Sequence, residues 1–331
     1  MEMKVTRFLV NVTTMFVVMG MLSGIVQAQN PSDNPVLLHR WSFNGPSEPN
    51  DWPSDPNDPA HPCHDSVGSA AAALFGAAKI TANALDLSAN TANLNEVADP
   101  NSGWASLPLA NTWKSLTDGF TIEAWFYLDG HSANSRILDS GELTQYDEIY
   151  LSERDPGIEV DGLAGGIYND GFLGTTYSDL SVSLETWHHV VYTSSKTVNQ
   201  AYLYLDGSSV ALATAEAAPS DLELLTVSYI GRCYIDNWPH VSLLKGRIDE
   251  LRIYGEMMTE ARMKSNFRCG PDDMGCPLDP TTCQEALDDG YSLASDFNHD
   301  CRVNLEDFAL FAAEWMRCII PTEESCEKPW Q

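Results

Sequence analysis

The chain has 331 residues, of which 44% are hydrophobic and 10% aromatic, and it carries 18 Lys and Arg against 47 Asp and Glu, a formal net charge of −29. A phosphate backbone or an anionic lipid surface would repel so acidic a chain, which argues against binding to nucleic acid or to a membrane surface. The apolar content is that of a folded globular protein rather than of a disordered one.

The N-terminus has the three parts of a secretory signal. Lys4 and Arg7 precede an apolar stretch over 8–26, and Val26-Gln-Ala28 ends with small residues at the usual cleavage positions. We therefore expect residues 1–28 to be a signal peptide, and the mature protein to be secreted or at the cell surface, or alternatively periplasmic. An uncleaved membrane anchor is the competing interpretation, but polar residues interrupt the stretch. No second apolar segment approaches spanning length, so no membrane span is expected after cleavage.

After a first predicted strand and a Pro/Asp/Asn-rich surface loop over 46–62, short apolar runs alternate with turn residues from about position 82 to position 254, with no competing helical period. The main predicted strands cover 36–43, 121–128, 187–192, 201–205 and 245–254. Asp129-Gly130 and Asp206-Gly207 follow two of them, and Asp-Gly is typical of tight hairpin turns, whose central residues need positive φ. The pattern predicts an all-β sandwich, followed by a short helix over 257–267 and a rigid linker over 269–282.

Five of these runs occur in the order typical of one family: 38–43, 120–126, 187–191, 202–207 and 246–254. Together they resemble the LamG-like jelly rolls of the concanavalin A-like lectin/glucanase group. The resemblance covers residues 36–268 and implies a concanavalin A-like jelly roll, two antiparallel sheets packed face to face. It also implies binding of carbohydrate or protein.

Strand alternation separates the predicted core from the other face. Phe120, Ile122, Ala124 and Phe126 share one face, which we expect to point inward. Trp125 and Trp187 are also predicted to fill the space between the sheets. His188 or His189 is expected to be a structural histidine with satisfied hydrogen bonds.

Asp249 shares its strand face with the apolar residues Leu251 and Ile253, so its carboxylate is predicted to point inward. A buried carboxylate is costly unless it is paired or bound to a cation. In related jelly rolls an aspartate at this place binds a structural Ca²⁺, and the resemblance therefore implies a calcium site at Asp249. Hydrogen bonding to nearby backbone N–H groups is the alternative.

The sandwich carries no complete catalytic motif. Laminarinase-type glycoside hydrolases share this fold and carry E-x-D-x-x-E on one strand. Glu159-Val-Asp161 begins such a pattern, but no third carboxylate follows. We therefore predict a non-catalytic domain that binds polysaccharide or glycan. A concanavalin A-like polysaccharide hydrolase or lyase is one alternative, and a surface adhesion protein that binds protein ligands is another.

Glycan-binding modules present aromatic rings outside the core. Tyr168 and Phe172 lie in a Gly-rich stretch over 163–174 that we expect to be a binding loop, and Trp238 lies in a second such stretch. Tyr177 is a further candidate. Trp52, Trp104 and Trp113 are also expected in loops.

Six of the eight cysteines lie after residue 268 and mark a small C-terminal unit over 283–326. In an exported chain they are disulfide candidates, although their pairing stays open. The candidates are Cys269, Cys276, Cys283, Cys301, Cys318 and Cys326.

A twelve-residue loop over 296–307 has oxygen ligands at the spacing of an EF-hand. The residues that supply side-chain oxygens at positions 1, 3, 5, 9 and 12 are Asp296, Asn298, Asp300, Asn304 and Asp307. Arg302 at position 7 would contribute its backbone carbonyl. The spacing predicts Ca²⁺ as the cofactor.

Phe308, Phe311 and Trp315 follow this loop at helical spacing, and loop and helix together resemble a type I dockerin repeat, D-x-N-x-D-G-x-V-N-x-x-D. The resemblance implies docking to a cohesin-like scaffold protein. Two features depart from the family: only one repeat is present, and Cys301 replaces the glycine at position 6. A left-handed backbone costs an ordinary residue about 1–2 kcal/mol there. A disulfide from Cys301 to a neighbouring cysteine would offset this strain.

Overall fold

The computed structural model describes residues 31–46, 53–91, 99, 101–142, 146–153, 162–169, 174–235, 242–288 and 291–315. The expected signal peptide lies outside these residues, as do the predicted site residues Phe172, Trp238, Cys318 and Cys326. None of the helices within the described ranges is long and apolar enough to cross a membrane.

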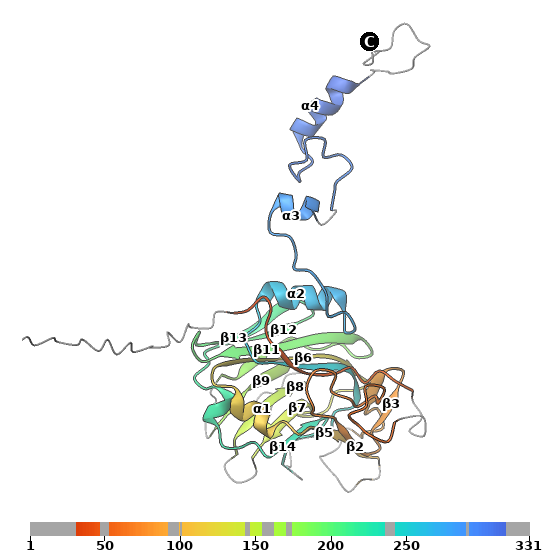
Figure 1. The fold of residues 1–331 in the computed structure, drawn as a ribbon, viewed down its shortest axis with the longest axis vertical. Helices are drawn as coiled ribbons and strands as arrows, with labels where there is room; N and C mark the ends of the chain where they lie inside the picture. Colours follow the sequence, from red (N-terminus) through yellow and green to blue (C-terminus); the bar gives the residue numbers. More distant parts are fainter. Residues whose placement is uncertain are drawn as a thin grey trace, which may run out of the picture.

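Two antiparallel sheets pack face to face, as predicted (Figure 1). The larger has eight strands in the order β13-β12-β11-β6-β15-β4-β3, with β1 also paired to β15. Its strands are β1 (Leu37–Trp41), β3 (Lys79–Thr81), β4 (Ala84–Asp86), β6 (Gly119–Leu128), β11 (Trp187–Ser195), β12 (Gln200–Leu205), β13 (Ser208–Ala213) and β15 (Gly246–Tyr254).

The second sheet has seven strands in the order β10-β9-β8-β7-β14-β5-β2. Its strands are β2 (Ala73–Gly76), β5 (Gly103–Ser106), β7 (Arg136–Gly141), β8 (Glu148–Ser152), β9 (Leu163–Tyr168), β10 (Thr176–Ser178) and β14 (Val227–Ile230). Two short helices, α1 (Ala110–Ser115) and the 3-10 helix η2 (Pro219–Asp221), lie in the connections and were not predicted.

The core lies between the sheets and confirms the predicted alternation along β6. Phe120, Ile122, Ala124 and Phe126 are fully buried in one cluster with apolar residues of both sheets. Burying side chains of this size contributes about 1.5–3 kcal/mol each, which specifies the face that turns inward.

Helix α2 (Glu260–Cys269) packs across the outer face of the eight-stranded sheet (Figure 1). It begins at the Thr259 cap, whose side chain accepts a hydrogen bond from the Arg262 N–H. The prediction for Trp125 and Trp187 is wrong. Trp125 packs on this outer face, with its ring centroid 4.3 Å from that of His189, and Trp187 is 43% exposed.

The two Asp-Gly pairs behave differently. Asp206 and Gly207 have φ of +49° and +78° and form the predicted hairpin between β12 and β13. Asp129 and Gly130 have no positive φ, and the strands that flank them, β6 and β7, belong to different sheets. The hairpin prediction is therefore wrong for Asp129-Gly130, where the chain crosses from one sheet to the other.

The C-terminal segment projects beyond α2 and carries α3 (Cys283–Asp288) and α4 (Leu305–Glu314) (Figure 1). Disulfides join Cys269 to Cys276 and Cys283 to Cys301, with Cα–Cα distances of 6.0 and 5.6 Å. These distances are ordinary for disulfides. Four of the six predicted cysteines are therefore paired.

Candidate functional site

The outer face of the seven-stranded sheet, the face turned away from the other sheet, combines aromatic and charged side chains. Ile149 and Leu151 on β8 point into the core, so the alternating residues Glu148 and Tyr150 occupy the outer face. Residues paired across neighbouring strands share a face, which extends this assignment to the other six strands.

A cavity of about 480 Å³ lies on this outer face over β2, β5 and β14. The rings of Phe75 and Trp104 stack with a 4° interplanar angle and centroids 5.6 Å apart. The Arg232 guanidinium lies 4.8 Å from the Trp104 ring centroid and 4.5 Å from that of Tyr229. Phe75 is 44% exposed, so the cavity offers an accessible aromatic surface beside a cation.

Tyr168 and Tyr177, two of the predicted ligand-binding residues, lie on this same outer face. Tyr168 pairs with Glu148, and Tyr177 pairs with Ala164 on β9. Both are partly exposed. They lie towards β10, whereas the cavity lies towards β2, so the structure places them on one face without bringing them into the cavity lining.

The prediction of a loop from 163 is wrong for its first half, because Leu163–Tyr168 forms strand β9. Glycines are needed there for close packing. A Cβ on Gly165 would come within 2.7 Å of the Tyr192 ring, and one on Gly166 within 2.5 Å of Thr175 Oγ1. The Gly-rich composition therefore reflects contacts on both faces of a strand.

Sequence reasoning missed Phe75, Tyr229 and Arg232. Trp104 was expected in a loop, but it lies on β5 and pairs with Phe75 on β2. Trp113, another loop candidate, is 1% exposed and belongs to the core. The aromatic residues at 75, 104 and 229 could have been noticed, but only the pairing of β2, β5 and β14 shows that they share a surface.

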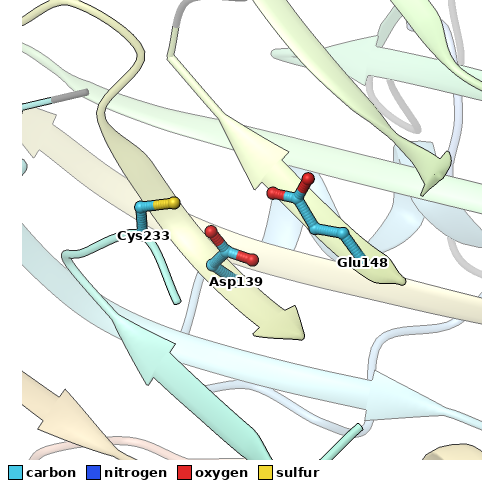
Figure 2. Close-up of side chains that lie close together, drawn as sticks. All are labelled: Asp139, Glu148 and Cys233. Atoms are coloured by element: carbon cyan, nitrogen blue, oxygen red, sulfur yellow. The ribbon is translucent and has the colours of Figure 1, made fainter. Parts of the chain in front are cut away.

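A buried charged cluster, whose side chains are drawn in Figure 2, lies on the same outer face, next to the cavity residue Tyr229 that pairs with Asp139. Asp139 on β7, Glu148 on β8 and Cys233 after β14 each place one oxygen or sulfur atom within 4.8 Å of the other two. Arg136 donates hydrogen bonds to Asp139 Oδ2 at 3.1 Å and to Glu148 Oε1 at 2.9 Å. Burial and the nearby Glu148 hold the pKa of Asp139 well above its usual range, although Arg136 opposes them.

Backbone geometry brings Cys233 over this sheet. Gly231, at φ +87°, lets the chain turn as it leaves β14. The following segment then crosses β7, where the Tyr234 ring lies so close to Gly141 that a Cβ on that glycine would approach it to 2.2 Å. The same turn positions Arg232 at the cavity and Cys233 at the charged cluster.

Asp249 does not point inward as predicted. The register of β15 on β6 passes from the pair Ile248–Phe126 to the pair Glu250–Trp125, so Asp249 is the extra residue of a β-bulge. Its Oδ1 is buried without a hydrogen-bond partner. Burial and the charges of Asp272 and Glu250 raise its pKa to about 7. Within the described residues, Asp249 belongs to no group of three candidate metal ligands, so its calcium role stays a prediction.

The outer face of the eight-stranded sheet buries a structural network of charges beneath α2. Glu123 accepts hydrogen bonds from Arg252 Nη1 at 3.2 Å and from the Asn266 amide at 3.0 Å, and it contacts His189 Nε2 at 2.8 Å. Burial alone would raise the pKa of Glu123, but Arg252 and His189 outweigh it and hold the pKa at about 2. Within the described part of the chain, the buried Nδ1 of His189 has no hydrogen-bond partner, so the expected histidine with satisfied hydrogen bonds is His188, which bonds Asp206 and Ser183.

In the predicted calcium loop, carboxylate oxygens of Asp296, Asp300 and Asp307 lie within 4.8 Å of one another. Asp296 and Asp307 are 5% and 2% exposed and accept backbone N–H bonds from within the loop. Asn298 contributes instead a hydrogen bond from its amide to Asp300 Oδ2, at 3.2 Å. Asn304 caps α4 by accepting the Glu306 N–H at 2.7 Å.

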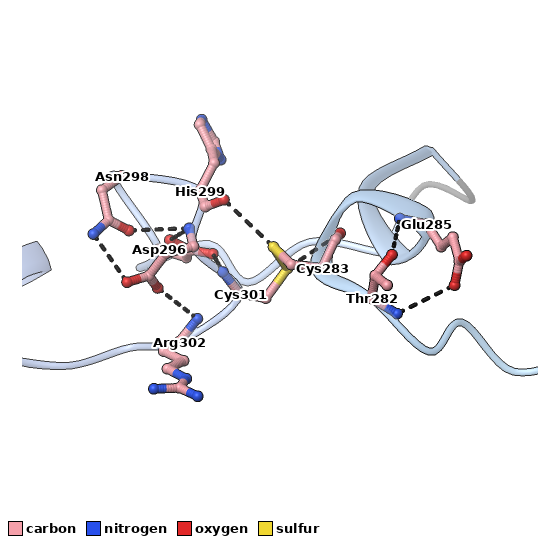
Figure 3. Close-up of a disulfide and its surroundings, with 9 residues drawn as sticks. Thr282, Cys283, Glu285, Asp296, Asn298, His299, Cys301 and Arg302 are labelled. Atoms are coloured by element: carbon pink, nitrogen blue, oxygen red, sulfur yellow. Dashed lines mark hydrogen bonds between the residues drawn. A yellow bond between two sulfur atoms is a disulfide. The ribbon is translucent and has the colours of Figure 1, made fainter.

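Position 6 of the loop adopts the left-handed backbone that the EF-hand spacing predicts there. Cys301 has φ of +66°, and its disulfide reaches Cys283 at the start of α3 (Figure 3). Arg302, at position 7, is exposed and donates its N–H to Asp300 Oδ1 at 2.9 Å. The expected link from Cys301 to a neighbouring cysteine is confirmed.

Helix α4 exposes large apolar side chains after this loop. Leu305, Phe308 and Trp315 are 83%, 63% and 62% exposed. Phe311 packs against Trp315, with ring centroids 4.9 Å apart, and lines a cavity of about 270 Å³ shared with Asp307. So much exposed apolar surface on a small acidic unit is typical of an interaction site.

Residues 99–263 match the model of the family described as the concanavalin A-like lectin/glucanases superfamily. With its two antiparallel sheets, this segment and the flanking strands form a concanavalin A-like jelly roll, as the sequence predicted. The search of curated proteins gave no match.

Several solved structures are similar to this chain at low identity. Domain 4 of AbnA, a GH43 extracellular arabinanase from Geobacillus stearothermophilus in complex with arabinotriose, is 15% identical over 70% of this chain and 97% of that chain, with a TM-score of 0.45. Trypanosoma rangeli sialidase in complex with sialic acid is 17% identical, over 70% of this chain but only 32% of that chain, with a TM-score of 0.47. Ruminococcus gnavus IT-sialidase CBM40 bound to alpha2,3 sialyllactose is 17% identical over 58% of this chain and 94% of that chain, with a TM-score of 0.41. Similarities this distant do not identify a ligand for this chain.

Proposed function

We propose that the jelly roll binds carbohydrate in the cavity on the outer face of its seven-stranded sheet. The observation that carries the proposal is the parallel stack of Phe75 on Trp104, with Phe75 accessible and Arg232 beside it. The C–H face of a sugar ring packs on such a surface, and the buried Arg232 guanidinium, against the Trp104 and Tyr229 rings, holds the aromatic surface in place. The cavity volume of about 480 Å³ is in the range of ligand pockets.

The alternative of a polysaccharide hydrolase gains no support from the same face. Asp139 and Glu148 are two carboxylates near the cavity, but they are 0% and 5% exposed and both are held by Arg136. A glycosidase needs its carboxyl pair open to the glycosidic bond. Non-catalytic binding therefore remains the proposal.

Replacing Phe75 with Ala is expected to weaken glycan binding about five- to tenfold, because one stacked ring contributes about 1 kcal/mol. Binding is measured first on an array of plant, algal and host glycans, and then by calorimetry with the best ligand. The matched control is Trp187→Ala, an equally exposed ring on the opposite sheet, which should leave affinity unchanged. If Trp187→Ala loses binding and Phe75→Ala does not, the glycan site lies on the eight-stranded sheet instead.

We further propose that the C-terminal segment binds Ca²⁺ and docks the protein to an extracellular cohesin-like scaffold. Asp296, Asp300 and Asp307 would hold the ion, since three converging carboxylates are the hard oxygen ligands that calcium takes. The bound cation would neutralise three like charges and fix the start of α4. The exposed apolar face of that helix, with Phe308 and Trp315, supports the docking role.

Asp300→Ala is expected to lower calcium affinity at least about tenfold and to abolish calcium-dependent retention on cell-envelope material. Asp300 is the exposed member of the three, so the change should not disturb folding. Calorimetry on the full chain at millimolar calcium measures the effect, with the exposed linker residue Asp273 changed to Ala as control. Equal heats for wild type and Asp300→Ala would remove the loop as the calcium site.

A further inference from the structure

The charged cluster on the seven-stranded sheet brings three potential metal-ligand side chains, two carboxylates and a thiol, to one point. Oxygens of Asp139 and Glu148 and the Sγ of Cys233 all lie within 4.8 Å of one another, and the three side chains converge from two strands and the segment after β14 (Figure 2). Asp139 and Cys233 are fully buried, and Glu148 is 5% exposed. We propose that this cluster is a site for a divalent transition-metal ion of the zinc class, held by three protein ligands.

Among the described residues, only one oxygen of the Asp139 carboxylate accepts hydrogen bonds from N–H groups. Asp139 Oδ2 accepts from Arg136 Nε at 3.1 Å and from the Tyr234 N–H at 3.2 Å, whereas the buried Oδ1 accepts from no N–H donor of the described chain, and the Asp139 and Glu148 carboxyl groups lie within hydrogen-bond reach of each other. Glu148 is held in the same way, with Oε1 bonded to Arg136. In protein metal sites, a hydrogen-bond donor in the second coordination shell holds one oxygen of a carboxylate ligand and so orients that ligand towards the metal. An unpaired buried carboxylate oxygen otherwise costs several kcal/mol.

The donor set selects the class of ion. A thiolate is a poor ligand for calcium or magnesium, whereas zinc takes Cys together with carboxylate oxygen. Two carboxylates and a thiolate balance one guanidinium and one divalent cation. Without the ion, one proton shared between the two carboxyl groups would neutralise the cluster. The test must therefore distinguish a bound metal ion from a shared proton.

Cysteine usage agrees with a metal role for Cys233. Among the described residues only Cys63 and Cys233 are free, and both are buried. Cys233 packs with Tyr234 and Tyr229, and its Sγ also lies beside two carboxylates, which packing alone does not explain. Cys63 has no such neighbours within the described ranges, which makes it the matched control.

The metal-free full-length protein is titrated with Co²⁺, which replaces zinc and gives a near-ultraviolet charge-transfer band only when a thiolate binds it. We expect this band in wild type and in Cys63→Ser, and its loss in Cys233→Ser. The oxygen-only calcium loop cannot produce the band. Cys318→Ser and Cys326→Ser variants should keep it, which excludes the two cysteines outside the described residues as its source.

Zinc retained after desalting should be one equivalent for wild type and none for Asp139→Asn, which keeps the shape of the side chain. If a variant fails to fold, the presence or absence of the charge-transfer band in the wild type still shows whether a thiolate binds the metal. Absence of a band in folded wild type, with no retained zinc, would overturn the proposal in favour of the shared proton. A band that survives in Cys233→Ser would also overturn it.

Discussion

Replacing Arg252 with Met is expected to lower the free energy of unfolding by about 3–5 kcal/mol, because it leaves the buried Glu123 without a guanidinium partner, whereas Glu250 keeps its pair with Arg40. Arg252 Nη1 donates to Glu123 at 3.2 Å, its Nε donates to Glu250, and both carboxylates are fully buried. The guanidinium also lies 4.6 Å from the Trp125 ring centroid. Urea unfolding followed by tryptophan fluorescence measures the change.

The control for this variant is Arg247→Met on the same strand. Arg247 is partly exposed and pairs with Asp129 at 3.3 Å, so its loss should cost less than about 1 kcal/mol. Equal losses for the two variants would mean that the network beneath α2 contributes no more than a surface ion pair.

Asp249→Asn is expected to stabilise the protein by about 1–2 kcal/mol at pH 8 and to have little effect near pH 4. Burial, Asp272 and Glu250 raise the pKa of Asp249 to about 7, above its unfolded value of 3.8. Between those pH values the folded state keeps a proton that the unfolded state releases, so stability falls as pH rises through this window. The full shift would correspond to about 4 kcal/mol, which solvent screening of a partly buried group reduces.

Thermal unfolding of wild type and Asp249→Asn from pH 4 to pH 8 tests this directly. Asp272→Asn removes one of the charges that raise the pKa, and it should shift the pH window downward while leaving the aspartate in place. Parallel stability curves for wild type and Asp249→Asn would show that Asp249 does not titrate in this range.

Local sequence patterns predicted the features whose physics lies within a few residues. Alternation over 120–126 identified the inward face of β6, and Asp206-Gly207 identified a hairpin, since both depend on neighbours along the chain. The spacing over 296–307 likewise placed three carboxylates together, and the position-6 residue Cys301 has the left-handed backbone. In each case the interacting groups are close in sequence.

Long-range packing decided the rest. The bulge at Asp249 depends on the register of β15 against β6, and one extra residue moves a side chain from one face to the other. The aromatic cavity exists because β2, β5 and β14 pair, and the cluster around Asp139 exists because the chain turns back at Gly231. Neither strand order nor register is encoded in the period of a single segment. The aromatic cavity and the cluster of Asp139, Glu148 and Cys233 therefore became visible only in three dimensions.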